Sequence, residues 1–274
     1  MSSPEVHVGE ANWLLAALPT AAYARVIAQC EIVPLVVKDT LFAPNAIIEH
    51  AYFPRHGCAS MISVMGDGAK VEVGTIGWEG MVGISLALGV SSVPTGCIVQ
   101  IAGDGVRISR EALEIELRDH AELRSILFLF AQAWVDTISR GSSCNGVHSV
   151  EERCARWLLM THDRVDGDVL PLTQEFLAIM LGVRRASVTL AAASLQQAGL
   201  INYKHGRITV LDREALESAS CECYAAIRSA YARLLPIRRP KVRDLEIRLD
   251  GNGTGSDGVG TEPHTVRNRT LKNS

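Results

Sequence analysis

The 274-residue sequence predicts an α+β fold with an N-terminal antiparallel β-roll, one long helix and a C-terminal domain of short helices. Three patterns support this prediction. Residues 32–110 alternate short β-branched runs with glycine-rich turns, an apolar repeat of helical period begins near Ala121, and two short helical patterns flank Gly182. No helix-length pattern separates the strands, which disfavours a parallel α/β sheet.

The composition is that of a folded globular protein. Apolar residues make up 47% of the chain and charged residues 21%, both near ordinary values. No stretch approaches the roughly 18 uninterrupted apolar residues of a membrane span, and the first residues lack the layout of a signal peptide. The sequence therefore predicts a soluble, cytoplasmic protein with no membrane partner. Its seven cysteines lack the spacing of a secreted framework and predict free thiols.

The N-terminal half contains six candidate strands, each rich in β-branched residues. They are the runs IVPLVV, IIEHAYF, SMISVM, KVEVGTIG, CIVQIA and VRIS. Turn signals such as Gly66-Asp67-Gly68 and Gly103-Asp104-Gly105 separate them. This regular spacing predicts a small antiparallel barrel or roll.

A long helix is predicted from about Ala121. Its apolar positions recur at helical spacing and form a narrow seam: Leu123, Ile126, Leu127, Phe130, Trp134 and Ile138. Two pairs in this seam are seven residues apart, as in a pairwise helix contact. The contact can lie within the chain or across a dimer, and we favour the dimer.

Two more helices follow the long one. Ser149 and Glu152 form the pattern of a capping box before a helix over residues 150–161. Residues 212–235 predict a last helix that Pro236 ends. Beyond it, a glycine-rich polar stretch has too few apolar residues to repay the entropy of folding, so residues 236–274 are predicted to be disordered.

Residues 171–211 show the pattern of a helix-turn-helix. Thr173 can cap a first short helix, Gly182 makes a sharp turn, and a second helix runs from about Arg185 to Ala198. The buried face of the second helix leaves four polar side chains at its outer N-terminal end: Arg184, Arg185, Ser187 and Thr189. In a helix-turn-helix this end reaches the base edges of DNA, and arginine can pair with guanine there.

A basic hairpin follows the second helix. Strands over residues 200–203 and 207–211 flank a turn, with Lys204 and Arg207 at the tip. The chain has a net charge of −3, yet within residues 171–211 these two cations, Arg184 and Arg185 face a single acid, Glu175. A local basic patch attracts the phosphate backbone whatever the overall charge. The segment therefore predicts a winged helix-turn-helix that binds double-stranded DNA.

The order of β-roll, long helix and winged helix-turn-helix, with the motif LTQEFLAIMLGVRRASVT, resembles the Crp/Fnr family of bacterial transcription regulators over roughly residues 10–225. The resemblance implies a cyclic-nucleotide-binding-like sensor roll over residues 10–120 and a dimerisation helix over 121–146. It places a winged helix-turn-helix DNA-binding domain over 147–214 and a C-terminal helix over 215–235. It also implies a homodimer that binds operator half-sites, with RNA polymerase as a further partner.

The same resemblance assigns individual roles. Arg185 matches the base-reading arginine and Lys204 the wing, while Thr173, Gln174 and Ser187 match positions that contact phosphates. The sequence departs from the cyclic-AMP receptor pattern in two places, because Ala186 replaces a base-reading glutamate and Leu190 replaces an arginine. A different operator is expected. The full predicted DNA-binding set is Thr173, Gln174, Arg184, Arg185, Ser187, Thr189, Lys204 and Arg207.

The predicted roll lacks the ligand residues of its relatives. Gly83 is present, but Ile84 stands where those rolls have a ribose-binding glutamate, and no Arg or Lys occurs between Glu79 and Ala102. A buried cyclic phosphate would lose its charge-assisted contact, so cyclic AMP is not expected to bind and no cofactor is expected. Cys30 is the sole cysteine among the first 57 residues, which excludes an iron–sulfur sensor, and a haem would rest on an isolated histidine: His7, His50 or His56.

The remaining reactive residues predict no metal site and no enzyme. On one helix the side chains of Cys221 and Cys223 would diverge by about 200° and could not readily share a metal, so we expect them to be structural. A redox role for these two, Cys144 or Cys154 stays open. No hydrolase elbow, Walker loop, zincin motif or dinucleotide fingerprint occurs. The alternative to a DNA-binding regulator is a ligand- or redox-responsive module whose C-terminal domain contacts protein.

Overall fold

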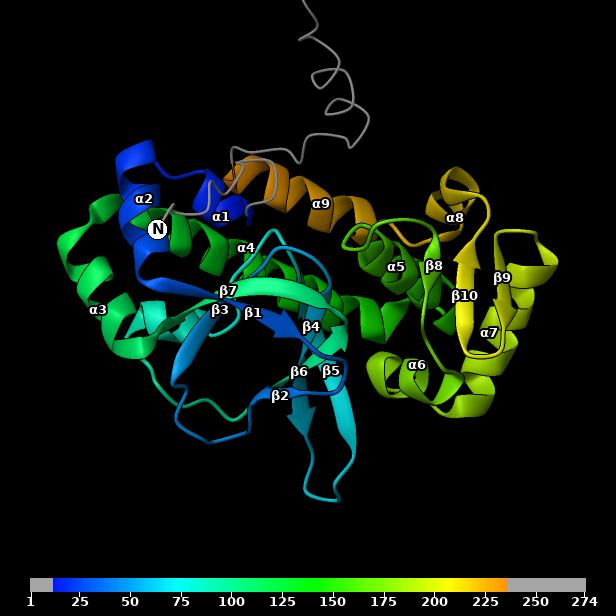
Figure 1. Ribbon diagram of the computed structural model, residues 1–274. Coiled ribbons are helices and arrows are strands. Elements are labelled where there is room, and N and C mark those ends of the chain that lie inside the picture. Colours follow the sequence, from blue (N-terminus) through cyan, green and yellow to red (C-terminus); the bar gives the residue numbers. More distant parts are fainter. Residues whose placement is uncertain (1–11, 236–274) are drawn as a thin grey trace, which may run out of the picture. The chain divides into compact units, whose positions relative to one another are not determined.

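Seven strands form the N-terminal roll in the computed structural model, which describes residues 12–235 (Figure 1). One sheet has the order β1-β7-β3, formed by Cys30–Leu35, Gly103–Ser109 and His50–Pro54. The other has the order β2-β6-β4-β5, formed by Thr40–Phe42, Gly96–Ile101, Cys58–Val64 and Lys70–Ile76. Every strand pair is antiparallel, which confirms the predicted roll. The sequence did not indicate β2, which is only three residues long.

Short helices surround the roll. They are α1 (Trp13–Ala16), α2 (Thr20–Ala28), the 3₁₀ helix η2 (Ile84–Leu88) and α3 (Arg110–Asp119). Helix α3 is not among the elements predicted from the sequence. It begins where Ser109 at the end of β7 accepts a hydrogen bond from the Ala112 N–H. Charged residues alternate closely with apolar ones in α3, and only Leu113, Glu116 and Leu117 are buried. This narrow apolar face gives a weak periodic signal.

The long helix α4 spans Ala121–Val147, within one residue of the predicted 121–146. Its apolar seam is buried within the chain itself: Leu123, Leu127 and Phe130 are fully buried and Trp134 nearly so. A Cβ on Gly80 would lie 2.5 Å from the Phe130 ring, so the roll packs tightly on this seam. The assignment of the seam to a dimer contact was therefore wrong, because the roll and α9 already cover it.

The C-terminal part contains α5 (Val150–His162), β8 (Val169–Leu170), α6 (Gln174–Leu181), α7 (Arg185–Gln197), β9 (Ile201–Lys204) and β10 (Arg207–Val210). The predicted capping box is confirmed: the Ser149 hydroxyl accepts from the Glu152 N–H, and the Glu152 carboxylate accepts from the Ser149 N–H at 2.8 Å. The hairpin of β9 and β10 is widened by β8, which the sequence analysis missed.

The predicted last helix is two helices. Residues Arg213–Ala219 form α8 and Cys223–Leu234 form α9, which packs along α4. Residues Ser220–Glu222 form the bend between them. The continuous helix expected over 215–235 is thus wrong, since the backbone at Ser220 is extended. The predicted tail over 236–274 and His7 lie outside the described residues.

Within residues 12–235, no single helix is both long and apolar enough to cross a bilayer. Helices α6 and α7 satisfy length and composition only when joined, and they are bent by 107° at their junction.

Candidate functional site

Helices α6 and α7 form the predicted helix-turn-helix. Thr173 caps α6, with its hydroxyl accepting from the Phe176 N–H at 3.2 Å. Gly182 ends α6 in the left-handed conformation, with φ of 62° and ψ of 38°, which glycine adopts without the steric cost of a Cβ. The 107° bend between the two helices lies in the range of helix-turn-helix motifs. The Arg153 guanidinium on α5 donates to the Leu181 carbonyl and holds the end of α6.

The predicted recognition residues lie at the surface of α7. Arg184 is its N-cap residue, Arg185 begins the helix, and both are exposed, as is Thr189. Ser187 is half-buried. The opposite face packs inward through Val188, Ala191, Ala192 and Leu195. Local periodicity thus oriented the helix correctly, because its buried and exposed faces follow the sequence spacing.

One hydrogen bond joins the two helices at this surface. The Thr189 hydroxyl lies 3.0 Å from the Gln174 side-chain oxygen and 3.1 Å from the Arg185 carbonyl oxygen. Gln174 is half-buried at the first position of α6. The structure therefore brings Gln174, Arg185 and Thr189 together, although Gln174 precedes Thr189 by 15 residues.

The wing has the predicted tight turn. His205 and Gly206 have φ values of 51° and 72°, as in the type I′ turn that fits a two-residue hairpin. Lys204 and Arg207 are paired across the hairpin, and both are exposed. The tip therefore carries two cations side by side.

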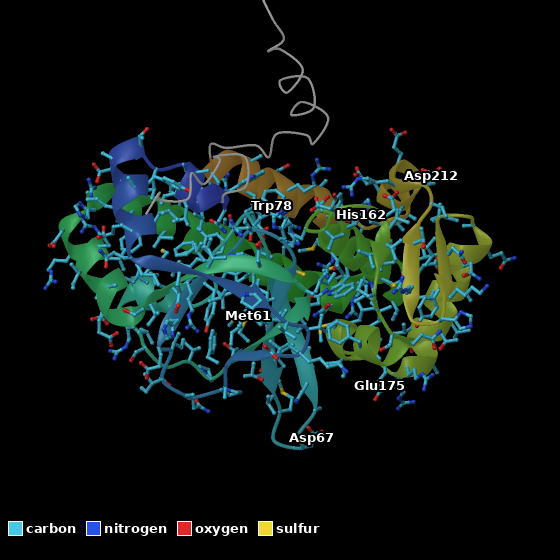
Figure 2. All side chains as sticks on the ribbon, viewed as in Figure 1. Met61, Asp67, Trp78, His162, Glu175 and Asp212 are labelled. Carbon is cyan, nitrogen blue, oxygen red and sulfur yellow. The ribbon has the colours of Figure 1, made fainter. Side chains whose placement is uncertain are left out.

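Four exposed cations lie at the start of α7 and at the tip of the wing. Among the described residues, Arg184, Arg185, Lys204 and Arg207 form no ion pair with a carboxylate. The single acid of the segment, Glu175, lies exposed in the first turn of α6 (Figure 2). Unpaired cations remain available to an external anion.

Two apolar side chains on α7 are exposed beside these cations. Leu190 is 73% exposed, and Ala186 also lies at the surface. Both residues depart from the cyclic-AMP receptor pattern, yet neither belongs to the predicted DNA-binding set. An exposed leucine on a helix whose other face is packed is the signal that could have included it.

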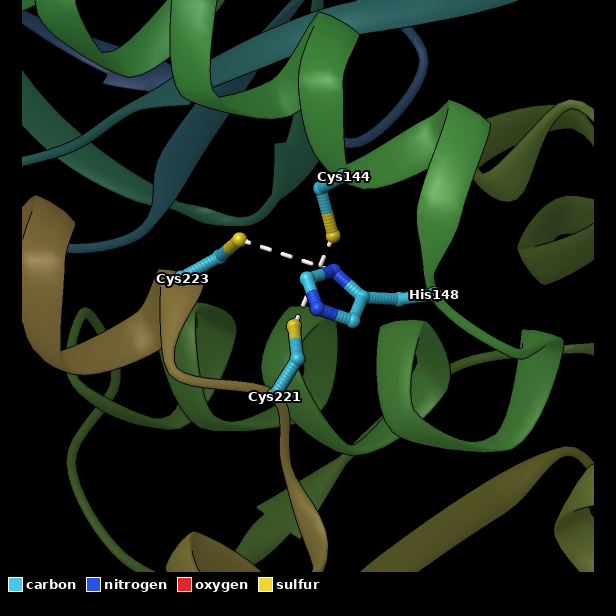
Figure 3. Close-up of side chains that lie close together, drawn as sticks. All are labelled: Cys144, His148, Cys221 and Cys223. Carbon is cyan, nitrogen blue, oxygen red and sulfur yellow. Dashed lines mark hydrogen bonds between the residues drawn. The ribbon is translucent and has the colours of Figure 1, made fainter.

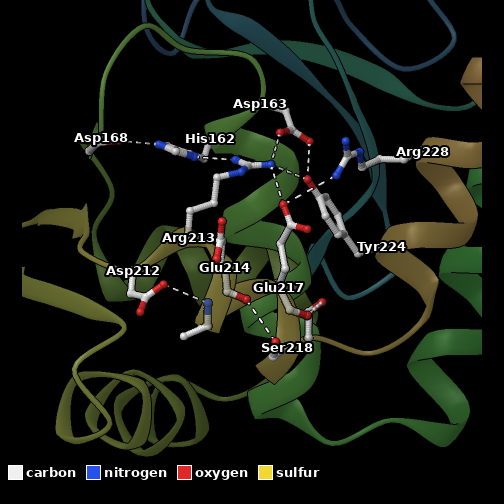
Figure 4. Close-up of polar contacts among 12 residues, drawn as sticks. His162, Asp163, Asp168, Asp212, Arg213, Glu214, Glu217, Ser218, Tyr224 and Arg228 are labelled. Carbon is white, nitrogen blue, oxygen red and sulfur yellow. Dashed lines mark hydrogen bonds and ion pairs between the residues drawn. The ribbon is translucent and has the colours of Figure 1, made fainter. Parts of the chain in front are cut away.

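A polar network anchors α8 to the end of α5 (Figure 4). The Arg213 guanidinium donates to the Asp163 carboxylate and to the Tyr224 hydroxyl, at 2.6 Å in each case. The Tyr224 hydroxyl in turn donates to the second Asp163 oxygen at 2.9 Å. Burial and the adjacent Asp163 raise the pKa of Tyr224, so its hydroxyl remains a donor. The network fixes the chain on both sides of the bend between α8 and α9.

Buried polar contacts join the roll to α5. The Arg164 guanidinium donates to one oxygen of Glu79 at 2.8 and 2.9 Å, and both side chains are less than 8% exposed. The Glu72 carboxylate on β5 accepts from the Trp157 indole N–H and contacts the Ser60 hydroxyl, both at 2.7 Å. Burial raises the pKa of Glu72 to about 7.

The ligand region of the roll contains η2. Gly83 precedes it with φ of 86°, and Ile84 is its first residue. Two arginines near the roll have partners within the chain: Arg107 with Glu31, and Arg124 with the Leu117 carbonyl oxygen at 2.8 Å. Both arginines thus already have contacts elsewhere in the chain, and neither belongs to the stretch between residues 79 and 102 that lacks a cation.

A second constellation lies where α4 meets the bend between α8 and α9 (Figure 3). Cys144, His148, Cys221 and Cys223 each direct one donor atom toward a common point, and these atoms all lie within 4.8 Å of one another. The prediction that Cys221 and Cys223 diverge on one helix was wrong, because Cys221 precedes the first turn of α9. All seven cysteines are free thiols, as predicted.

Comparison with known proteins locates the domain and the fold. The model of the Crp-like helix-turn-helix domain matches residues 152–219. No curated protein matches the chain. Among solved structures, FixK2 from Bradyrhizobium japonicum is similar with a TM-score of 0.61 and 15% identity, covering 70% of this chain and 98% of that one.

Two further structures have the same fold. The c-di-GMP-responsive global regulator CLP from Xanthomonas campestris has a TM-score of 0.57 and 18% identity, covering 70% of this chain and 99% of that one. A CRP-family transcriptional regulator from Thermus thermophilus has a TM-score of 0.57 and 19% identity, covering 69% and 96%. Residues 152–219 thus match a Crp-like helix-turn-helix domain, and the chain shares its fold with these regulators.

Proposed function

We propose that this protein is a transcription regulator of Crp/Fnr type, which acts in the cytoplasm as a homodimer and binds operator half-sites in double-stranded DNA with α7 in the major groove. One observation carries the proposal: the cations at the start of α7 and at the wing tip are exposed and, among the described residues, form no ion pair. Local positive charge of this kind supplies affinity for phosphates in a protein with a net charge of −3.

We assign base contacts to the exposed face of α7. Arg185 at its N-terminal end can form a bidentate contact with guanine. Ala186 and Leu190 present apolar surface one helical turn apart, which suits the methyl groups of thymine. A half-site with a guanine flanked by thymines fits this combination.

The other polar residues position the protein on the backbone. Arg184 makes no side-chain cap at the start of α7, so it and the first N–H groups of the helix can meet a phosphate. Lys204 and Arg207 would follow the backbone beside the groove. Phosphate contacts from Thr173, Gln174 and Ser187 would fix the register of α7 without specifying sequence.

The proposed dimer uses a different face of α4 from the buried seam. Exposed residues recur there with alternating steps of four and three: Ala121, Ser125, Phe128, Gln132, Val135, Ser139, Ser142 and Gly146. Phe128 is 46% exposed and Val135 is 53% exposed, and most of the other positions are small. This heptad pattern supports a coiled-coil contact between two copies of α4.

The roll is proposed to act without cyclic AMP, and RNA polymerase is proposed as a partner of the DNA-bound dimer. The absence of a phosphate-binding cation between residues 79 and 102 supports the first point. A micromolar dissociation constant for a cyclic nucleotide requires a binding free energy of about 8 kcal/mol. Uncharged hydrogen bonds contribute only about 0.5 to 1.5 kcal/mol each.

Selection of genomic DNA fragments on the purified full-length protein tests the proposed function. We expect enriched fragments to share an inverted repeat whose half-sites lie about one helical turn apart. Titration of that site should show an affinity that falls linearly with the logarithm of salt concentration. Failure to enrich any sequence would favour the alternative in which the C-terminal domain contacts protein.

The dimer face has its own test. Replacing Phe128 and Val135 with glutamate should yield a monomer in sedimentation, because charges would occupy the centre of the apolar stripe. Ile115→Glu is the control, since Ile115 is 50% exposed on α3, away from this stripe. A double variant that remains dimeric with normal secondary structure would place the dimer contact elsewhere.

A further inference from the structure

Three cysteines and one histidine converge beneath the start of α9. Cys144 lies in the last turn of α4, His148 follows the end of that helix, and Cys221 and Cys223 come from the bend that begins α9. The cysteines are at most 4% exposed, and the His148 side chain is 15% exposed. The two halves of the cluster are 77 residues apart at Cys144 and Cys221.

The separations are those of ligands around one ion. The sulfurs of Cys144 and Cys221 are 3.5 Å apart, and the Cys223 sulfur lies 3.7 Å from Nδ1 of His148. A tetrahedral zinc site with ordinary bond lengths has edges of about 3.8 Å between two sulfurs and about 3.6 Å between sulfur and nitrogen. These two contacts lie close to those edges, and every other separation in the cluster is at most 4.8 Å. The sulfurs of Cys144 and Cys221 are too far apart for a disulfide, whose S–S bond is about 2.05 Å.

His148 is oriented by a further residue. Its Nε2 lies 3.1 Å from a carboxylate oxygen of Glu222, the residue between the two cysteines of the bend. A proton held on Nε2 by this carboxylate leaves the lone pair of Nδ1 directed at the sulfurs. Metal-binding histidines in proteins are typically held by a carboxylate in this way. A purely structural cysteine cluster would not require that arrangement.

The surroundings suit three thiolates and a divalent cation, which together carry one negative charge. The side chains of Arg153 and Arg156 on α5 lie close enough to act electrostatically on these cysteines, or to be acted on by them. Both guanidiniums are largely buried and therefore bring positive charge to the wall of the site. The local charge is thus compensated within the fold.

The geometry points to a site for Zn²⁺ in which Cys144, His148, Cys221 and Cys223 are the four ligands and Glu222 orients His148; we propose this assignment. Three sulfurs and one imidazole nitrogen form a donor set that zinc prefers. Four protein ligands leave no open position, so the site is structural and does not activate water. The ion would tie the junction of α4 and α5 to the bend between α8 and α9.

Metal content of the full-length protein tests the assignment. Protein purified without chelators should contain about one zinc per chain by elemental analysis, and cobalt should replace it with the visible absorption of a tetrahedral thiolate complex. Cys144→Ser and Cys221→Ser should each lose the ion. Cys154→Ser is the matched control, because Cys154 is equally buried on α5 but lies outside the cluster, and it should keep one zinc.

A milder variant covers the case in which the serine variants do not fold. Glu222 is 70% exposed, so Glu222→Gln should fold normally and bind zinc about 10- to 100-fold more weakly in a chelator competition. Wild-type protein that takes up neither zinc nor cobalt would overturn the proposal. So would a Cys144–Cys221 disulfide as the stable form in reducing buffer, or a Cys221→Ser variant that binds like wild type. None of these readouts uses DNA, so they stand apart from the test of DNA binding.

Discussion

Arginine has opposite roles in the helix-turn-helix and in the contact between the roll and the turn that follows α5. Arg185 is exposed on α7 and, within residues 12–235, pairs with no carboxylate, whereas Arg164 is buried against Glu79 with two hydrogen bonds. Burying an unpaired charge costs free energy, so the buried Arg164 needs the ion pair with Glu79. The exposed Arg185 is hydrated and can remain unpaired until an external anion binds. The exposed Arg185 is therefore available for the proposed DNA contact, whereas the buried Arg164 stabilises the fold.

The largest expected effect comes from breaking the buried pair. Arg164→Ala should reduce the free energy of unfolding by about 3 to 5 kcal/mol in chemical denaturation, because the Glu79 carboxylate would remain buried without its cation. Arg107→Ala removes the partly exposed pair with Glu31 and should cost less than about 1 kcal/mol. If both variants lost the same free energy of unfolding, burial would not explain the difference between the two ion pairs.

A second effect concerns Glu72 and depends on pH. The Ser60 hydroxyl lies 2.7 Å from both Glu72 and the Gln100 side-chain oxygen, yet it has one proton to donate. A protonated Glu72 can donate to Ser60, which frees the hydroxyl proton for Gln100. Burial is the largest effect and raises the pKa of Glu72 to about 7, whereas the hydrogen bonds from Ser60 and Trp157 act in the opposite direction.

The sign of the dependence follows from linkage. Because the folded state holds the proton more tightly than the unfolded chain, Glu72 should lower stability increasingly as pH rises from about 4.5 to 7. Glu72→Gln imitates the protonated form and should be more stable than wild type at pH 8, by no more than about 3 kcal/mol, and equal to it at pH 4. Denaturation of both proteins across this range measures the difference. A stability difference between the two proteins that stayed constant from pH 4 to pH 8 would show that Glu72 does not titrate in this range.

The smallest effects on stability are expected at the recognition surface. Arg185→Ala and Lys204→Ala should each change the free energy of unfolding by less than about 0.5 kcal/mol, because neither side chain is buried. Arg185→Ala should reduce discrimination between operator and unrelated DNA by about 1 to 3 kcal/mol. Lys204→Ala should weaken binding to all sequences alike and lower the salt slope by about one unit. If Arg185→Ala discriminated between operator and unrelated DNA as well as wild type does, the proposed position of α7 in the major groove would be wrong.

Sequence patterns predicted those features that depend on neighbouring residues. The capping box at Ser149, the left-handed Gly182, the turn at His205 and Gly206 and the two faces of α7 all follow from local spacing. Each depends on a few consecutive residues whose backbone preferences agree with the fold. For this reason the predicted DNA-binding residues could be placed on a surface before the structure was known.

Three features escaped sequence reasoning because distant segments decide them. The apolar seam of α4 was visible, but periodicity does not say what covers it, and the roll and α9 do so. The sequence over residues 212–235 has a helical pattern, but the chain bends at residues 220–222. Tertiary contacts of Arg213 and Tyr224 stabilise this bend against the local preference for a continuous helix. The Cys–His cluster needs that bend, since it turns Cys221 and Cys223 toward the same point.

The sequence by itself determined the order of the roll, the long helix and the winged helix-turn-helix, together with the cations that α7 and the wing present. These depend on local periodicity and on turn chemistry, which act over at most a few turns of chain. The tertiary structure alone decided which face of α4 stays exposed and which four side chains gather at its end. Both outcomes arise from packing between segments as far apart as Cys144 and Cys221, and such contacts leave no periodic trace along the chain.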